Sequence, residues 1–279
     1  MRTKAVFNSS VETLRRYVAT RFPLRLYLPC ALLLVTAGLA GGRRLDAMGL
    51  AGAGLLAWNL LLQFRLLDDL SDLEHDRRAH PDRVLCQMSS LGAARVLLGV
   101  CGVVNLGLVA AQPGPPHRLD GFLLLCAAAL LWYACLRAAL PDRVLGAHAI
   151  LVKYPVFVYL VSGDGRGGWP LGLAMAVVYL CFSLYEVRHD LLLHSVPGAA
   201  IARRIALGAF AVVAALMTLT LIHAGTTVLV VHGVLSGGGA LLLYGGSARR
   251  RPFASPDGSY AVFLLGWAVL LNFLLGVRP

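Results

Sequence analysis

Residues 46–78 read DAMGLAGAGLLAWNLLLQFRLLDDLSDLEHDRR, and this stretch decides the class of fold. Its greater part, 46–70, is a mainly apolar run. A helix of about 20 such residues is long enough to cross the hydrocarbon of a lipid bilayer. The remainder is rich in acids and ends in two arginines. We therefore predict a membrane-spanning helix that carries an acidic cluster where it leaves the hydrocarbon.

The composition of the whole chain agrees with a membrane protein. Of its 279 residues, 58% are hydrophobic and 14% are charged, and the mean hydropathy is +0.73. This is more apolar surface than the core of one soluble domain buries. The net charge of +11 would suit nucleic acid, but the arginines form short clusters between apolar runs. We expect no nucleic-acid partner and assign the charge to loops that face anionic membrane lipid.

Apolar runs of spanning length recur along the chain and predict an all-α, polytopic membrane protein. The nine expected transmembrane helices cover 24–41, 46–70, 92–112, 119–140, 143–162, 169–188, 204–224, 226–244 and 259–277. Their connections are short, so we expect one domain over 1–279, with the helices in a single bundle around a central apolar cavity. A short basic segment, 1–22, precedes the first span.

The distribution of Lys and Arg predicts the orientation, because these residues are concentrated in cytoplasmic loops. With nine spans and a cytoplasmic N-terminus, most of the basic residues lie inside. The regions assigned to the outside hold only Arg43, Arg44, Arg118, Arg166 and Arg278. Segments 71–91 and 189–203 then share the cytoplasmic side of what we expect to be the cell membrane, and 163–168 faces outward.

The acids of the second span are spaced for a common site. At 100° per residue, Arg65, Asp69, Asp72 and Asp76 fall within about 60° of arc on a continuous helix. Carboxylates gathered at a membrane end need a cation, and hard oxygen ligands suit Mg²⁺. The alternative is a solvated helix end whose acids pair with arginines of 77–83.

A second acidic pair lies at the end of the sixth span. Glu186 and Asp190 are four residues apart, with Arg188 between them. The predicted topology places this pair on the same membrane side as the first cluster. Two carboxylate-rich helix ends with basic neighbours are typical of sites in which metal ions clamp a diphosphate.

The residues Asp68-Asp69-Leu-Ser-Asp72-Leu-Glu-His-Asp76 resemble the first aspartate-rich motif of the UbiA superfamily of intramembrane prenyltransferases, NDxxDxxxD. Asp68 stands at the Asn position and the other three acids at the Asp positions. Glu186 to Asp190 occupies the place of the family's second motif, DxxxD, with Glu in place of the first Asp. The plan of nine helices, with motifs after the second and sixth, matches the family over nearly the whole chain.

The resemblance implies a Mg²⁺-dependent enzyme and assigns roles to residues. The expected metal ligands are Asp68, Asp69, Asp72, Asp76, Glu186 and Asp190, all of which except Asp68 are also the expected catalytic residues. Arg83 lies in a segment similar to the family's arginine-containing segment after the motif, and Arg137 resembles a basic diphosphate contact. Lys153 is an intramembrane cation, which is rare and usually faces a cavity or an anion. The expected diphosphate contacts are Arg65, Arg83, Arg137, Lys153 and Arg188.

Three functions are compatible with these patterns. The first is transfer of a prenyl group from a prenyl diphosphate to a lipophilic or aromatic acceptor at the cytoplasmic side of the membrane. The second is a terpene cyclase of the same superfamily, in which ionisation of the diphosphate leads to ring closure. The third is a cation-binding transporter, which is less consistent with acids at one membrane end than with acids at the midplane.

Overall fold

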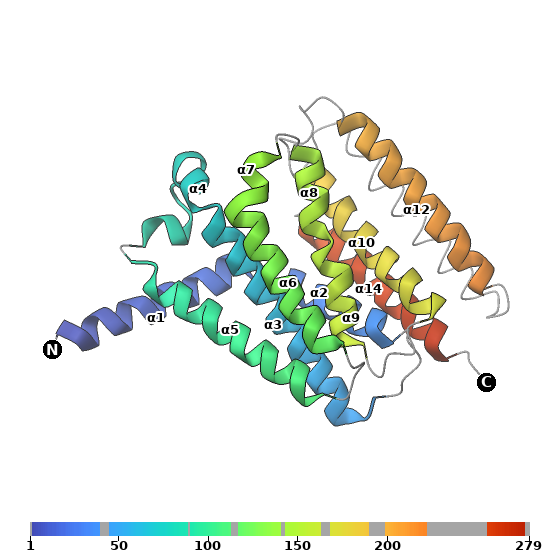
Figure 1. Ribbon diagram of the computed structural model, residues 1–279, viewed down its shortest axis with the longest axis horizontal. Helices are drawn as coiled ribbons and strands as arrows, with labels where there is room; N and C mark the ends of the chain where they lie inside the picture. The colour runs from blue at the N-terminus through green and yellow to red at the C-terminus, as the bar shows by residue number, and fades with distance from the viewer. Residues whose placement is uncertain are drawn as a thin grey trace.

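The computed structural model describes residues 2–39, 45–88, 90–112, 117–140, 143–162, 168–189, 199–221 and 256–276. All regular secondary structure within these residues is helical, which confirms the predicted all-α class (Figure 1). In chain order the longer helices are α1 (Arg2–Arg21), α2 (Leu24–Leu39), α3 (Ala47–Ser71), α5 (Gly92–Ala111), α6 (Arg118–Leu131), α8 (Arg143–Leu151), α9 (Lys153–Val161), α10 (Trp169–His189), α12 (Ala199–Leu221) and α14 (Pro256–Gly276). The shorter elements are α4 (Leu73–Ala79), the 3₁₀ turn η1 (Val84–Gln87), the π-helical turn η2 (Trp132–Leu136) and α7 (Arg137–Ala139).

Eight of the nine predicted spans coincide with helices of the structure, and the remaining one, 226–244, lies outside the described residues. Among the described residues, five helices are long and apolar enough to cross a membrane, or six if the bent pair α1–α2 counts as one span. The chain is therefore an integral membrane protein. The total of nine spans and the central apolar cavity stay predictions.

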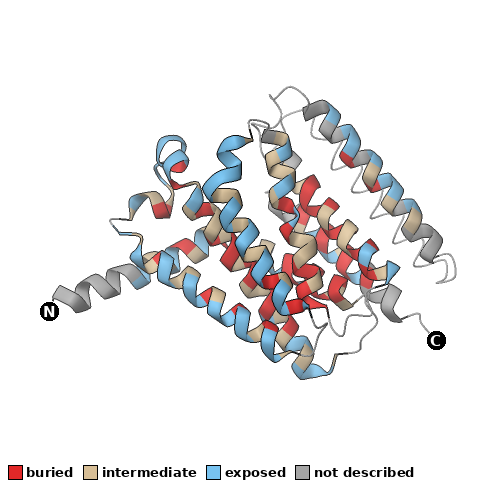
Figure 2. Cartoon of the chain, in the orientation of Figure 1, coloured by how far each residue is buried: buried red, intermediate tan, exposed pale blue. Residues whose placement is uncertain are grey.

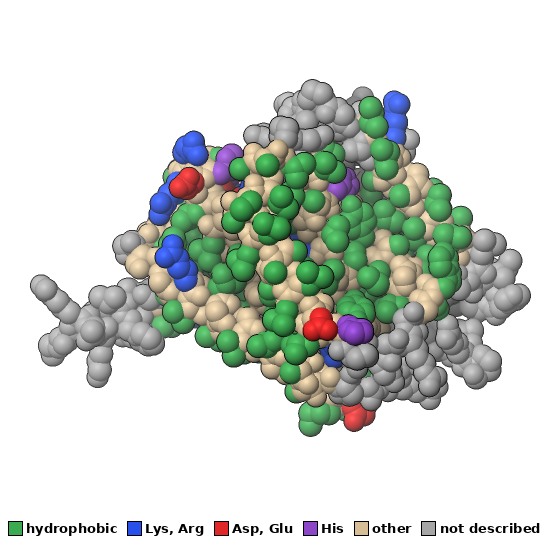
Figure 3. All heavy atoms as spheres, in the orientation of Figure 1, with side chains coloured by type: hydrophobic (Ala, Val, Ile, Leu, Met, Phe, Trp, Pro, Cys, Tyr) green, Lys and Arg blue, Asp and Glu red, His purple; other side chains and the backbone are tan. Residues whose placement is uncertain are grey.

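The core lies where α2 packs against α14, α3 and α9, with α10 packed on α2 and α9. Figure 2 shows buried residues gathered on α2, α3, α10 and α14, whereas α5, α6 and α12 are largely exposed. The exposed side chains of these outer helices include large apolar ones, such as Val103 on α5 and Leu124 on α6, both 71% exposed. Figure 3 shows apolar side chains over the middle of the visible face and charged ones toward its ends. Such a band matches hydrocarbon contact.

Prolines accompany one bend and one interruption of the helices near the site. Between α1 and α2 the chain turns by 70° at Phe22-Pro23, because proline has no N–H to continue the helix. The predicted span 143–162 divides at Val152 into α8 and α9. Pro155 cannot donate a hydrogen bond to the carbonyl of Leu151, so the ladder weakens at this point. Lys153 begins the second half of this broken span.

Candidate functional site

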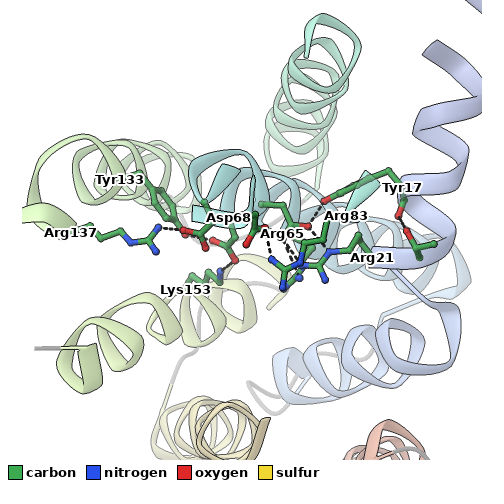
Figure 4. A network of polar contacts seen from close by, with 12 residues as sticks. Tyr17, Arg21, Arg65, Asp68, Arg83, Tyr133, Arg137 and Lys153 are labelled. Atoms are coloured by element: carbon green, nitrogen blue, oxygen red, sulfur yellow. Dashed lines mark hydrogen bonds and ion pairs between the residues drawn. The ribbon is translucent and has the colours of Figure 1, made fainter. Parts of the chain in front are cut away.

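The first acidic motif lies at a helix break. Helix α3 ends at Ser71 and α4 begins at Leu73, so Asp72 stands between them. The helix predicted to be continuous through the motif is therefore interrupted at Asp72, although Asp72 N still donates to Asp68 O and Asp76 N to Asp72 O. Each carboxylate contacts a different set of basic side chains (Figure 4).

Asp68 faces the broken span and the end of α6. Its Oδ2 accepts a hydrogen bond from Lys153 Nζ at 2.5 Å, and its Oδ1 accepts one from the hydroxyl of Tyr133. The Lys153 side chain is 9% exposed, and its Nζ lies 5.5 Å from the ring centroid of Tyr154. The intramembrane lysine predicted to bind diphosphate is thus already paired with the acid that stands at the family's Asn position.

Asp72 pairs with Arg137 through the guanidinium Nη1 and the carboxylate Oδ1. The two side chains are 35% and 43% exposed, so this is the most open acid–base pair of the motif in the described structure. Arg137 follows η2, the π-helical turn that carries Tyr133. π-Turns inside helices occur frequently at functional sites. This one brings Tyr133 and Arg137 onto Asp68 and Asp72.

Asp69 is buried on the opposite side of the motif, under α1. Its Oδ2 accepts hydrogen bonds from Tyr17 Oη at 2.9 Å and Arg21 Nε at 3.2 Å. Its Oδ1 lies 2.8 Å from Arg21 Nη2 and 3.2 Å from Arg65 Nη2. The predicted proximity of Arg65 and Asp69 is confirmed, since they are four residues apart on α3.

Asp76 pairs with Arg83, which lies just before η1. The Asp76 side chain is 7% exposed, and Val84 and Leu85, which follow Arg83 in η1, are buried in a small apolar cluster. The alternative prediction, a solvated helix end whose acids pair with nearby arginines, is met at Asp76 in the pairing but not in the solvation, because this acid is buried. Arg77 is exposed to solvent.

Only half of the second acidic pair is described. Glu186 is half-buried on α10, whereas Asp190 and the side chain of Arg188 lie outside the described residues. Tyr154, which follows Lys153 on α9, stacks on Phe182 of α10, one helical turn before Glu186, with ring centroids 3.5 Å apart. The end of α10 therefore approaches the first motif, as the predicted topology requires.

The donor set fits a Mg²⁺ ion that shares its coordination with substrate. Among the described residues, no three His, Cys, Asp or Glu side chains gather closely enough to hold a metal ion by themselves. Mg²⁺ is usually bound by one or two protein carboxylates, with waters and substrate phosphate oxygens completing the octahedron. Asp72 could serve as such a carboxylate, because it is partly exposed and, among the described residues, only its Oδ1 is paired, with Arg137.

Three residues of this network were not predicted as site residues, namely Tyr17, Arg21 and Tyr133. The sequence does hold a signal for them. Tyr17 and Arg21 are four residues apart, as are Tyr133 and Arg137, so each Tyr-x-x-x-Arg pair lies on one helix face. Both pairs contact acids of the same motif. A tyrosine and an arginine at this spacing near a membrane end are worth weighing as partners of an acidic cluster.

Apolar outer helices and a charged network that joins α1, α3, α4, η2 and α9 define a polytopic membrane protein with an ionic site inside its helical bundle. A comparison with protein-family models gives no match, and neither does a comparison with curated protein sequences. Among solved structures, the chain is similar to a digeranylgeranylglyceryl phosphate synthase in membranes. The TM-score is 0.62 and the sequence identity 16%, over 95% of this chain and 98% of that one. The chain thus has the fold of this membrane synthase, which confirms the predicted resemblance at the level of the fold.

Proposed function

We propose that the protein is a Mg²⁺-dependent intramembrane prenyltransferase that moves a prenyl group from a prenyl diphosphate to a lipophilic or aromatic acceptor. The observation that carries this proposal is the ionic network inside the helical bundle. Within the described residues, four acids of one motif pair with five basic side chains: Arg21, Arg65, Arg83, Arg137 and Lys153. The similar solved structure, by its name, is a synthase that acts in membranes.

A diphosphate suits this network on chemical grounds. Guanidinium groups suit phosphate oxygens, because their planar donors match the geometry of the anion. Arg137 is the most exposed of the basic side chains in the network and pairs with the most exposed acid. Its pairing with Asp72 contributes little to stability, since exposed ion pairs are worth about 0–1 kcal/mol. Arg137 is therefore available to exchange Asp72 for a diphosphate oxygen.

The proposed reaction breaks the bond between the allylic carbon and the diphosphate oxygen, and the bond electrons leave with the diphosphate. A bound Mg²⁺ would neutralise charge that develops on the leaving group. Asp72 is proposed as its first carboxylate ligand, and Asp68, Asp76, Glu186 and Asp190 as the acids that complete its coordination or that of a second ion. Arg65, Arg83, Arg137, Lys153 and Arg188 are proposed to stabilise the diphosphate oxygens. The acceptor then attacks the allylic carbon and releases a proton.

The test uses detergent-purified full-length protein, prenyl diphosphates of different lengths, candidate lipophilic acceptors and mass spectrometry of the products. A transferase yields an acceptor-linked product and diphosphate only when Mg²⁺ is present. Conversion of the prenyl diphosphate alone into a ring-closed product would identify a cyclase instead. Absence of diphosphate release under all conditions would contradict both activities and favour a cation carrier.

Two substitutions locate the site. Asp72→Asn is nearly isosteric and removes the exposed carboxylate charge, so turnover should be nearly abolished while the protein still folds. Asp82→Asn is the matched control, because Asp82 is an exposed acid beyond the motif. Equal losses of turnover in the two variants would show that the site has been assigned to the wrong residues.

A further inference from the structure

The carboxylate of Asp69 differs from the other acids of its motif in how completely the protein occupies it. A carboxylate has about four lone-pair positions. Tyr17 and Arg21 contact Oδ2, and Arg21 and Arg65 contact Oδ1, so four donor contacts fall on the two oxygens. The Asp69 side chain is 8% exposed. A metal ion could bind this carboxylate only by displacing one of these donors.

Asp72 provides the contrast three residues further along. Its side chain is 35% exposed, and its recorded contact is with Arg137, which is itself 43% exposed. Among the described residues, protein donors thus contact both oxygens of Asp69, whereas Asp72 Oδ2 has no hydrogen bond or ion pair to them. Both residues stand at Asp positions of the motif, but their environments differ.

Two of the three side chains that contact Asp69, Tyr17 and Arg21, lie on α1, and a small apolar cluster also holds this helix against the motif. Tyr17 is fully buried, and Leu14 and Val18 pack with it against Leu66 of α3 and Leu85 of η1. The opposite face of α1 is polar, with the Arg15 side chain 81% exposed. Because the chain bends by 70° after α1, the helix is held against the motif by this small apolar cluster and by the contacts to Asp69.

We propose that Asp69 is a positioning residue, which fastens α1 to the acidic motif and does not bind the metal. This inference rests on the proposed function. Tyr17 and Arg21 are the residues of α1 through which Asp69 holds the helix in place. Arg65 stays beside the site because it contacts the same Oδ1 atom of Asp69 as Arg21. Metal binding then falls to the carboxylates that face away from α1, with Asp72 foremost.

The decisive comparison is between Asp69→Asn and Arg21→Met. Both substitutions remove the ion pair between Arg21 and Asp69, but Arg21→Met leaves the Asp69 carboxylate in place. If Asp69 is a positioning residue, the two variants behave alike, and the double variant is no worse than either single one, because residues of one network have non-additive effects. If Asp69 is a metal ligand, Asp69→Asn alone weakens metal binding.

Metal binding is measured with Mn²⁺ and inorganic diphosphate, by the electron paramagnetic resonance signal of free Mn²⁺. Asp69→Asn and Arg21→Met should keep the wild-type affinity, whereas Asp72→Asn should lower it by about tenfold or more. In activity assays both positioning variants should lower kcat while leaving the Mg²⁺ midpoint unchanged, since a misplaced network costs turnover rather than metal affinity.

The docking of α1 has its own readout. In a Leu14→Cys background, maleimide labelling followed by peptide mass spectrometry reports whether the buried face of α1 opens. Labelling should accelerate with Asp69→Asn or Arg21→Met and stay unchanged with Asp72→Asn. Burial, and then the nearby Asp76 carboxylate, raise the pKa of the native Cys86 thiol, so this neighbour should react slowly.

Two results would overturn the inference, namely weaker Mn²⁺ binding in Asp69→Asn but not in Arg21→Met, or unchanged labelling of Leu14→Cys in both variants. The proposed function fails in a different way. If Asp72→Asn also keeps full Mn²⁺ affinity and activity, the metal site is wrong. Faster labelling in the Asp69 and Arg21 variants would still support the fastening of α1.

Discussion

Lys153 Nζ lies 2.5 Å from Asp68 Oδ2, across the contact between α9 and α3. The lysine begins α9 just after the break at Val152, and the acid stands where the UbiA motif has asparagine. A negative charge added to the motif is thus neutralised by a positive charge from another helix. The two residues form a buried pair, with side chains 9% and 22% exposed.

Removing one member of this pair should be more harmful than removing both. Lys153→Met leaves the Asp68 carboxylate buried beside Tyr133 with no cation, and we expect it to lower the free energy of unfolding by about 3–5 kcal/mol. The double variant Lys153→Met/Asp68→Asn should regain most of that loss, because asparagine carries no charge. Thermal unfolding in detergent measures both. A double variant as unstable as Lys153→Met would mean that the lysine stabilises the fold through packing alone.

Arg137 should matter for catalysis and hardly for stability. Its pair with Asp72 is largely exposed, so Arg137→Gln should change the free energy of unfolding by less than about 1 kcal/mol. If the guanidinium binds the diphosphate, kcat/KM should fall by about tenfold or more. Arg77→Gln is the matched control, because Arg77 is exposed and lies on the same end of the bundle. Similar kinetics in both variants would remove Arg137 from the site.

The acids of the second motif should act through the metal. Glu186→Gln is expected to raise the Mg²⁺ concentration for half-maximal activity, with partial recovery at excess Mg²⁺, and Asp190→Asn should do the same. Loss of a contact made only in the transition state would instead lower turnover at every metal concentration. Titration of Mg²⁺ at saturating substrate distinguishes the two cases. Asp120→Asn, an exposed acid at the start of α6, is the control. An unchanged midpoint in both acid variants would mean that the first motif carries the metal alone.

The site and the start of α6 should lie on opposite sides of the membrane. We expect a thiol reagent confined to the cytoplasmic side to label Ser90→Cys, which is exposed after η1, and not His117→Cys, which is exposed just before α6. Ser195→Cys should be labelled together with Ser90→Cys. Labelling of Ser195→Cys from the outside would contradict both the nine-span topology and a site shared by the two motifs.

The sequence predicted the helical elements well because hydrophobic length leaves little choice in a membrane. In hydrocarbon every backbone polar group must be paired within the segment, so an apolar run such as 92–112 becomes a helix whatever its neighbours are. The interruptions of the helices were harder to predict from the sequence. Asp72 and Val152 interrupt runs that look continuous, and only Pro155 gave a local sign of the second interruption.

The chain by itself determined the membrane class, the helices that are described and the presence of an acidic motif at a membrane end, since these depend on composition and on spacing along one element. Which acid meets which base was decided only by the tertiary structure. Asp69 contacts Tyr17 and Arg21, and Asp68 contacts Lys153, across 48 to 85 residues of sequence. A carboxylate in a low-dielectric setting must be satisfied by whichever donors the packed helices bring to it, and helical periodicity carries no information about those distant donors.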